Sequence, residues 1–309
     1  MLAIDDTLAG QRLDNFLFKR LKGVPKSRIY RMLREGEVRV NRRRAAPELR
    51  LEEGDMVRIP PVRVASPAPN PAVGGAPARF SRPLLQRVLY RDDSLLILDK
   101  PAGQAVHGGS GVSLGIIEQL RLELPEQRFL ELVHRLDKET SGVLVLALKR
   151  PVLTEMHRKL RQGEVKKCYQ ALAVGHWQDP VRHVKLPLHK QVNEAGERRV
   201  SVREDGQAAH TIFRLLRHHP GFSLLRAELK TGRTHQIRVH LAALKYPIAG
   251  DDKYGDFELN RALKKQGLKR MFLHAASLEF RHPLTGQELR VEAPLPEDLA
   301  GFLSRLTKV

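Results

Sequence analysis

Residues 134–147 read His-Arg-Leu-Asp-Lys-Glu-Thr-Ser-Gly-Val-Leu-Val-Leu-Ala, a polar cluster that runs into a short apolar stretch. An apolar stretch of this length, bounded by turn residues and rich in Val and Leu, is typical of a buried strand. The polar residues before it are expected to form a loop at the mouth of a rigid core, where catalytic groups often lie. Arg135 and Lys138 flank Asp137 in this loop and favour its ionised form. Two interpretations of Asp137 remain open at this point: it caps the turn at Thr140–Gly142, or it is a functional carboxylate.

The composition points to a nucleic-acid partner. The chain has 309 residues, enough for two domains, and its 54 Lys and Arg against 35 Asp and Glu give a formal net charge of +19. The basic residues recur along most of the chain, which favours nucleic acid over a membrane surface as the polyanionic partner. Cys168 is the only cysteine, so an internal disulfide and a cysteine-based metal cage are excluded. The start has no secretory pattern and no stretch reaches about 18 apolar residues, so we expect a cytoplasmic protein without a membrane span.

Residues 1–60 form the first expected domain. Apolar spacing predicts helices over 8–21 and 25–36, and alternation predicts strands over 37–41 and 51–59. This unit resembles an S4 RNA-binding domain, in which the second helix and the adjoining hairpin turn lie on RNA. The resemblance implies RNA contacts for the arginines at the matching positions, which are Arg28, Arg31, Arg39, Arg42, Arg43 and Arg44. Residues 61–83 are rich in Pro, Ala and Gly, which predicts a linker.

Residues 84–309 form the second expected domain. Strand signals outnumber helix signals, so we expect an α+β fold with a largely antiparallel sheet. Residues 166–174 are predicted as a strand with Cys168 and Tyr169 on opposite faces, whereas residues 175–206 are expected to be mostly loop. Thr234 is predicted to cap a helix whose buried stripe includes Ile237 and Leu241.

Two polar clusters in this domain carry candidate chemistry: the one around Asp137 and the one from Arg233 to His240. His235 and His240 are five residues apart, not the four that place two imidazoles on one helix face, which argues against a metal site. The chain has no Gly-x-Ser-x-Gly nucleophile elbow and lacks the second conspicuous carboxylate of a glycosidase. One carboxylate on a basic protein leaves nucleophilic or base catalysis on a nucleic acid. If Arg233 pairs with Asp137, it holds that carboxylate ionised.

Five motifs in the same order resemble the RluA family of RNA pseudouridine synthases, and together with the S4 unit they cover nearly the whole chain. They are residues 90–103, 134–142, 167–169, 232–238 and 272–275. The resemblance implies isomerisation of uridine to pseudouridine within RNA by base flipping. It also implies 23S ribosomal RNA of the large subunit as the partner, with no cofactor, no metal, no membrane and a monomeric protein.

The resemblance also implies roles for matching residues. Asp137 would be the catalytic carboxylate, as nucleophile or as base on the sugar, and Arg233 its ionic partner. Tyr169 would stack on the flipped base, and removal of the C5 proton is a second role open to it. Ile237 and Leu273 would form apolar walls, and Arg135 would enter the RNA stack in place of the uridine. The alternative, a non-catalytic S4-type RNA-binding or ribosome-assembly factor, explains the charge but gives the Asp137 and Arg233 clusters no purpose.

Overall fold

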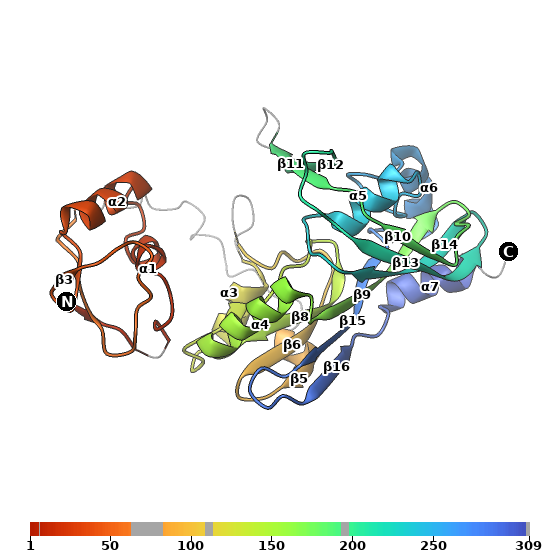
Figure 1. The fold of residues 1–309 in the computed structure, drawn as a ribbon. Helices are drawn as coiled ribbons and strands as arrows, with labels where there is room; N and C mark the ends of the chain where they lie inside the picture. Colours follow the sequence, from red (N-terminus) through yellow and green to blue (C-terminus); the bar gives the residue numbers. More distant parts are fainter. Residues whose placement is uncertain (6, 63–82, 109–113, 193–197, 307–309) are drawn as a thin grey trace.

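The computed structural model describes residues 1–5, 7–62, 83–108, 114–192 and 198–306. The expected linker lies mostly outside these residues. The chain before residue 63 and the chain after residue 82 each have their own sheet and apolar core, and we call them the N-terminal unit and the C-terminal unit. The fold-class prediction of a small helical and stranded unit followed by a larger α+β unit is confirmed (Figure 1).

The N-terminal unit packs two helices against a four-stranded sheet of order β1-β4-β2-β3. Its apolar core includes Leu13, Leu17 and Ile29, which are fully buried at helical spacing. Between β2 and β3, Asn41 and Arg42 both have positive φ, as a tight two-residue hairpin turn requires. The elements are β1 (Leu2–Ala3), α1 (Leu13–Arg20), α2 (Lys26–Glu35), β2 (Arg39–Val40), β3 (Arg43–Arg44) and β4 (Met56–Arg58).

The C-terminal unit contains most of the helices and strands. In chain order its elements are the 3-10 helix η2 (Leu84–Arg87), β5 (Val88–Arg91), β6 (Leu95–Lys100), α3 (Ile116–Glu123), β7 (Glu131–Leu132), β8 (Ser141–Ala147), α4 (Arg150–Gln162), β9 (Lys166–Val174), β10 (Val181–Val184), β11 (Leu188–Val192), β12 (Arg198–Val202), β13 (Thr211–His219), β14 (Phe222–Leu229), α5 (Gln236–Ala243), α6 (Phe257–Lys265), β15 (Leu273–Arg281), β16 (Glu288–Glu292) and α7 (Glu297–Leu306).

A ten-stranded sheet runs through this unit in the order β10-β13-β14-β9-β15-β8-β6-β5, with β16 beside β15 and β7 beside β8 (Figure 1). Every pairing in it is antiparallel except that of β15 with β8. The expectation of a largely antiparallel mixed sheet is therefore confirmed. Strand β8 is buried along its whole length, as its unbroken apolar sequence predicts.

Two apolar cores cover the two faces of the sheet. On one face, α3, α5, α6 and α7 contribute to a cluster that includes Trp177 and Phe213. On the other, α4 contributes Val152 and Met156. The strands at the centre of the sheet are thus fixed from both sides, and the loops at their ends are held on a rigid support.

One sequence-based expectation is incomplete and another is wrong. Residues 175–206, expected to be mostly loop, also contain β10, β11 and β12. These strands were missed because many of their positions are polar, so they lack the apolar alternation of a half-buried strand. Thr234 does not cap α5: the N-cap is His235, which has φ +53 and makes no side-chain capping bond. The chain enters the helix through a left-handed residue, which changes the direction of the following side chains.

Candidate active site

A cleft of about 1120 Å³ opens in the C-terminal unit beside the loop that carries Asp137. The loop lies between β7 and β8, and the start of α5 forms another part of the wall. All six residues of this unit to which the resemblance gives a role line the cleft, although they come from four separate segments: Arg135, Asp137, Tyr169, Arg233, Ile237 and Leu273.

The Asp137 loop is held from below by Lys100, the last residue of β6. The Lys100 side chain is fully buried, and its Nζ donates to the carbonyl oxygens of Pro101, Lys138 and Thr140 at 2.8, 3.0 and 2.8 Å. Burial lowers the pKa of Lys100 to about 7, while the nearby carboxylates of Glu139 and Asp137 favour its charged form. One amine therefore ties the part of the loop that follows Asp137 to the end of β6.

Gly142 lets the loop pass directly into β8. Its φ is +109, and a Cβ there would lie 2.2 Å from the carbonyl oxygen of Ala275 on β15. This close approach permits the parallel pairing of β8 with β15, in which Ala275 lies opposite Gly142. Beside it, Ser141 Oγ and His274 Nδ1 are 2.9 Å apart. Ser141 and Gly142 thus allow close strand packing, and they fix where the loop ends and β8 begins.

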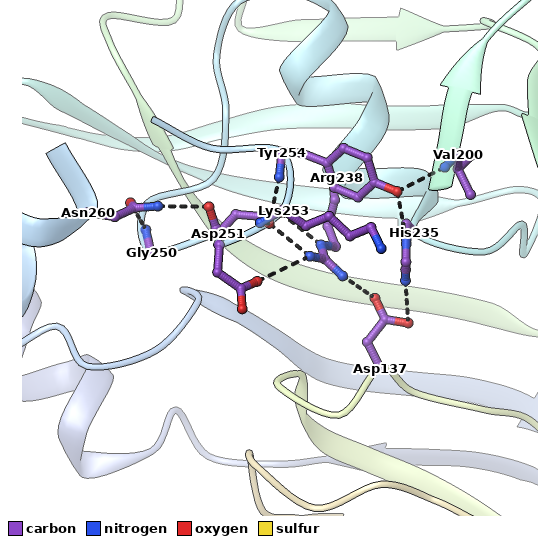
Figure 2. Close-up of polar contacts among 10 residues, drawn as sticks. Asp137, Val200, His235, Arg238, Gly250, Asp251, Lys253, Tyr254 and Asn260 are labelled. Carbon is purple, nitrogen blue, oxygen red and sulfur yellow. Dashed lines mark hydrogen bonds and ion pairs between the residues drawn. The ribbon is translucent and has the colours of Figure 1, made fainter. Parts of the chain in front are cut away.

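The guanidinium that pairs with Asp137 belongs to Arg238, not to Arg233. Arg238 Nη1 donates to Asp137 Oδ2 at 3.1 Å, and the Arg238 side chain is only 8% exposed (Figure 2). Arg233 is exposed, its Nε donates to the Ala208 carbonyl at 3.1 Å, and no ion pair of Arg233 with Asp137 is recorded in the described part of the chain. The expected ionic role of Arg233 is wrong because it precedes α5, whereas Arg238 lies within the helix and points inward.

Asp251 holds Arg238 from the other side (Figure 2). Its fully buried carboxylate accepts from Arg238 Nε and Nη2 at 2.8 Å each. Burial alone would raise the pKa of Asp251, but the hydrogen bonds and charge of Arg238 lower it. Asp251 is itself fixed, because its Oδ1 accepts from the backbone of Lys253 and Tyr254 and its carbonyl accepts from Asn260 Nδ2 at 2.7 Å. Arg238 thus approaches Asp137 with its orientation already set.

His235 lies on the second oxygen of Asp137. Its Nε2 is 3.8 Å from Asp137 Oδ1, and its Nδ1 is 2.8 Å from the Tyr254 hydroxyl. Burial lowers the pKa of His235, although the charge of Asp137 partly opposes this. His235, Asp251 and Tyr254 were not singled out as site residues with Asp137. One sequence signal could have pointed to such a partner: α5 reads Gln-Ile-Arg-Val-His-Leu-Ala-Ala, and an arginine inside so apolar a helix needs a carboxylate beside it.

Apolar and aromatic side chains close the cleft. Tyr169 is 8% exposed, and Ile237 and Leu273 are each 4% exposed. Burial raises the pKa of Tyr169, and the charge of Asp137 adds to this effect, so its hydroxyl stays protonated. Cys168, its neighbour on β9, is buried and its Sγ accepts from Arg226 Nη2 at 3.1 Å. Tyr169, Ile237 and Leu273 thus give the cleft an apolar wall beside Asp137.

The histidines of α5 do not meet at one point. His240 Nδ1 is 2.9 Å from the Thr211 hydroxyl and its Nε2 is 2.9 Å from the Leu186 carbonyl, whereas His235 faces Asp137. Within the described ranges, no group of three His, Cys, Asp or Glu side chains could hold a metal ion. None of the described helices is long and apolar enough to cross a membrane.

The arginines of the N-terminal unit fall into two groups. Arg28 pairs with Glu37 at 3.2 Å and Arg31 with Glu35 at 2.7 Å. Arg39 donates to the carbonyls of Gly36 and Arg42. The arginines of the β2–β3 hairpin tip are exposed and form no ion pair within the described part of the chain. They are Arg42, Arg43 and Arg44.

Comparisons with known proteins agree with this architecture. A sequence profile described as RNA pseudouridylate synthase matches residues 94–243, and one described as S4 domain matches residues 11–57. The ribosomal large subunit pseudouridine synthase C of Escherichia coli strain K12 is 51% identical over 311 residues, covering 99% of this chain and 96% of that protein. The protein of the same name from Yersinia pestis is 49% identical over 308 residues, covering 100% of this chain and 96% of that protein.

A solved structure is also similar. The human protein named RNA Pseudouridylate Synthase Domain Containing 4 superposes with a TM-score of 0.60 at 29% identity, covering 72% of this chain and 94% of that one. Both sequence relatives are alike over almost their whole length, so the likeness includes the N-terminal unit as well as the cleft. The chain therefore belongs to the RNA pseudouridine synthases, as an enzyme with an S4 domain in front of its pseudouridylate synthase domain.

Proposed function

We propose that this protein converts specific uridines of 23S ribosomal RNA to pseudouridine, with Asp137 as the catalytic carboxylate. The observation that carries the proposal is the position of Asp137: on a rigid loop, 29% exposed to the cleft, and paired with a buried arginine. The names of the relatives support large-subunit ribosomal RNA as the substrate. The net charge of +19 suits a partner whose backbone is polyanionic.

The reaction is an isomerisation. The bond from uracil N1 to ribose C1′ breaks, the base turns, C5 bonds to C1′, the C5 proton leaves, and N1 gains a proton. No atoms are gained or lost overall and no oxidant or reductant is needed. The carboxylate of Asp137 serves either as the nucleophile on C1′ or as the base on the sugar, and the ion pair with Arg238 fixes its position for both routes.

A uridine inside an RNA helix cannot reach Asp137 unless it leaves the stack, at a cost of a few kcal/mol. Arg135 is exposed at the rim of the cleft, and a guanidinium can both stack on bases and bind phosphate. In the proposal it fills the vacated position. Tyr169 then stacks on the flipped uracil between the walls of Ile237 and Leu273. Because its hydroxyl stays protonated, we assign Tyr169 to stacking and not to removal of the C5 proton.

We propose residues 1–60 as the S4 domain that binds RNA, 61–83 as the linker and 84–309 as the catalytic domain. A monomer is expected, which sedimentation would test. The bacterial sources and ribosomal names of the relatives support a cytoplasmic location.

Asp137→Asn tests the proposal, with Asp93→Asn, an exposed turn residue, as the matched control. We expect Asp137→Asn to bind RNA with near-normal affinity and to form no pseudouridine, while Asp93→Asn forms pseudouridine at the wild-type rate. Mapping pseudouridine in ribosomal RNA of cells that lack the protein, and of cells complemented with each variant, gives the target uridines. Wild-type protein that forms no pseudouridine would favour the S4-type assembly factor, and an active Asp137→Asn would overturn the role of Asp137.

A further inference from the structure

Tyr254 contacts the two side chains that face the carboxylate of Asp137, Arg238 and His235, and also Asp251, which holds Arg238 (Figure 2). Its backbone N–H donates to Asp251 Oδ1 at 3.0 Å. Its ring lies against the guanidinium of Arg238, with 5.1 Å from Cζ to the ring centroid. Its hydroxyl is 2.8 Å from Nδ1 of His235, and the two rings meet edge to face. Tyr254 thus contacts Asp251, Arg238 and His235, and it is placed to act on Asp137 from both sides.

The hydrogen bonds of the Tyr254 hydroxyl determine where its proton points. The backbone N–H of Val200, on β12, donates to the Tyr254 oxygen at 3.1 Å. Burial raises the pKa of Tyr254, so the hydroxyl keeps its single proton. In the part of the chain that the structure describes, His235 Nδ1 is the one acceptor recorded for that proton.

This arrangement selects one tautomer of His235. Burial keeps the pKa of His235 below its usual value, so the ring is neutral near pH 7 and carries one proton. Since Nδ1 accepts from Tyr254, the proton lies on Nε2. That nitrogen is the one that faces Asp137 Oδ1, at 3.8 Å.

The two oxygens of Asp137 are therefore held differently. Oδ2 accepts a direct hydrogen bond from Arg238 at 3.1 Å. Oδ1 faces an N–H that lies beyond hydrogen-bond range, so its lone pairs stay available. At this distance the Nε2–H of His235 attracts Asp137 Oδ1 and orients the carboxylate without forming a hydrogen bond to it. In the other tautomer the lone pair of Nε2 would face Oδ1 and repel it.

We propose that Tyr254 is a positioning residue of this enzyme: it fixes His235 as the Nε2–H tautomer and so directs Asp137 Oδ1 toward the ribose. The inference rests on the proposed function for its effect on rate, but the tautomer is a property of the protein without RNA. Tyr254 does not touch the substrate in this scheme, and its effect passes through His235 and Arg238. Loss of its hydroxyl should thus slow the chemical step and leave RNA binding intact.

The test compares Tyr254→Phe with Tyr246→Phe, a half-buried tyrosine whose hydroxyl donates to the His176 carbonyl at 3.4 Å outside the cleft. We expect Tyr254→Phe to lower kcat about tenfold, with KM and RNA affinity within twofold of wild type. Tyr246→Phe should match wild type in all three. Equal kcat for the two variants, in a preparation whose wild type forms pseudouridine, would overturn the proposal.

A second measurement determines the tautomer of His235 in the wild-type protein, which requires neither catalysis nor a folded Tyr254 variant. Long-range ¹H–¹⁵N spectra of the ¹⁵N-histidine-labelled wild-type protein report the tautomer of each ring, and loss of signals in His235→Gln identifies those of His235. We expect the Nε2–H form in wild type and a mixture of both tautomers in Tyr254→Phe. An Nδ1–H ring in wild type would overturn the inference even if pseudouridine forms. Wild-type protein without activity but with the Nε2–H ring would instead overturn the proposed function.

Discussion

The Nη1 atom of Arg238 lies 3.1 Å from Oδ2 of Asp137, although the two residues are 101 positions apart in the chain. The contact joins the loop between β7 and β8 to the first turn of α5. Because Arg238 is almost fully buried, the pair is shielded from solvent and from salt to a degree that surface pairs are not. The carboxylate of Asp137 is thus held at the cleft wall by a guanidinium that Asp251 fixes on its other side.

The first prediction separates Arg238 from Arg233. Arg238→Lys should lower kcat about 100-fold, because an ammonium cannot bind Asp137 and Asp251 together in the geometry of a guanidinium. Arg233→Lys should lower it less than threefold, since the Arg233 side chain is exposed and bonds a backbone carbonyl. Single-turnover pseudouridine formation with both variants checks this, and a larger loss in Arg233→Lys would contradict the assignment of the ion pair.

The position of the Asp137 loop could be predicted from the sequence, but its ionic partner Arg238 could not. Asp137 lies beside an apolar strand that cannot be anything but buried, so its position at the mouth of the core follows locally. Choosing between Arg233 and Arg238 requires the direction of α5, which depends on the left-handed backbone of His235 and on packing against distant strands. Likewise Asp251 lies in a turn whose contact with Arg238 exists only in three dimensions.

The same contrast holds for the fold. Strand β9 was predicted with its observed ends, because its last four residues are all apolar and it is bounded by polar residues and Gly175. Strands β11 and β12 were missed, since residues such as Lys190 and Gln191 give no apolar alternation and the pair is stabilised by its own backbone ladder. Short polar ribbons of this kind depend on the surface they rest on, here α5 through Val239.

The second prediction concerns Asp251. Asp251→Asn should lower the free energy of unfolding by about 3–5 kcal/mol, because it leaves the buried Arg238 without its bidentate carboxylate. Asp252→Asn is the control: Asp252 is 81% exposed and only 3.8 Å from Arg238, and such a pair contributes about 0–1 kcal/mol. Urea unfolding of the two variants beside wild type measures both effects. Equal stabilities of the two variants would show that Asp251 does not anchor Arg238.

The third prediction concerns the support of the Asp137 loop. Lys100→Met should lower the free energy of unfolding by about 1–3 kcal/mol, because the carbonyls of Pro101, Lys138 and Thr140 lose a common donor. We also expect the activity of Lys100→Met to be lower than that of wild type when both are measured at a temperature where the variant is fully folded. Lys149→Met, at an exposed lysine between β8 and α4 and outside the cleft, should leave both unchanged. A fully active Lys100→Met would mean that the loop holds its shape without this amine.

The fourth prediction concerns the hairpin tip of the N-terminal unit. Replacing Arg42, Arg43 and Arg44 together by Gln should weaken RNA binding and reduce the slope of log K against log salt by about 2–3, since each phosphate contact contributes about 0.7–0.9. A triple variant with the same loss of charge elsewhere, at Arg217, Arg281 and Arg290, should change the slope by less than 1. Titrations at several salt concentrations distinguish them, and equal slopes would show that the tip does not contact phosphate.

The last prediction concerns acid stability and His134, which precedes the catalytic loop. Its Nε2 accepts from the backbone N–H of Val145 at 3.2 Å, and burial lowers the pKa of His134 to about 4 from an ordinary value of 6.5. Between these two pH values the unfolded chain binds a proton at His134 and the folded chain does not. Stability due to this group is therefore complete above pH 6.5 and is lost as the pH falls to 4, by about 3 kcal/mol.

His134→Gln tests the sign, because a glutamine oxygen can accept from Val145 without titrating. Urea unfolding at several pH values should show a smaller loss of stability from pH 6.5 to 4 for His134→Gln than for wild type. His176→Gln, at an exposed histidine, should follow the wild-type curve. Coinciding curves for wild type and His134→Gln would mean that His134 is not held neutral in the folded state and that acid acts on the fold through other groups.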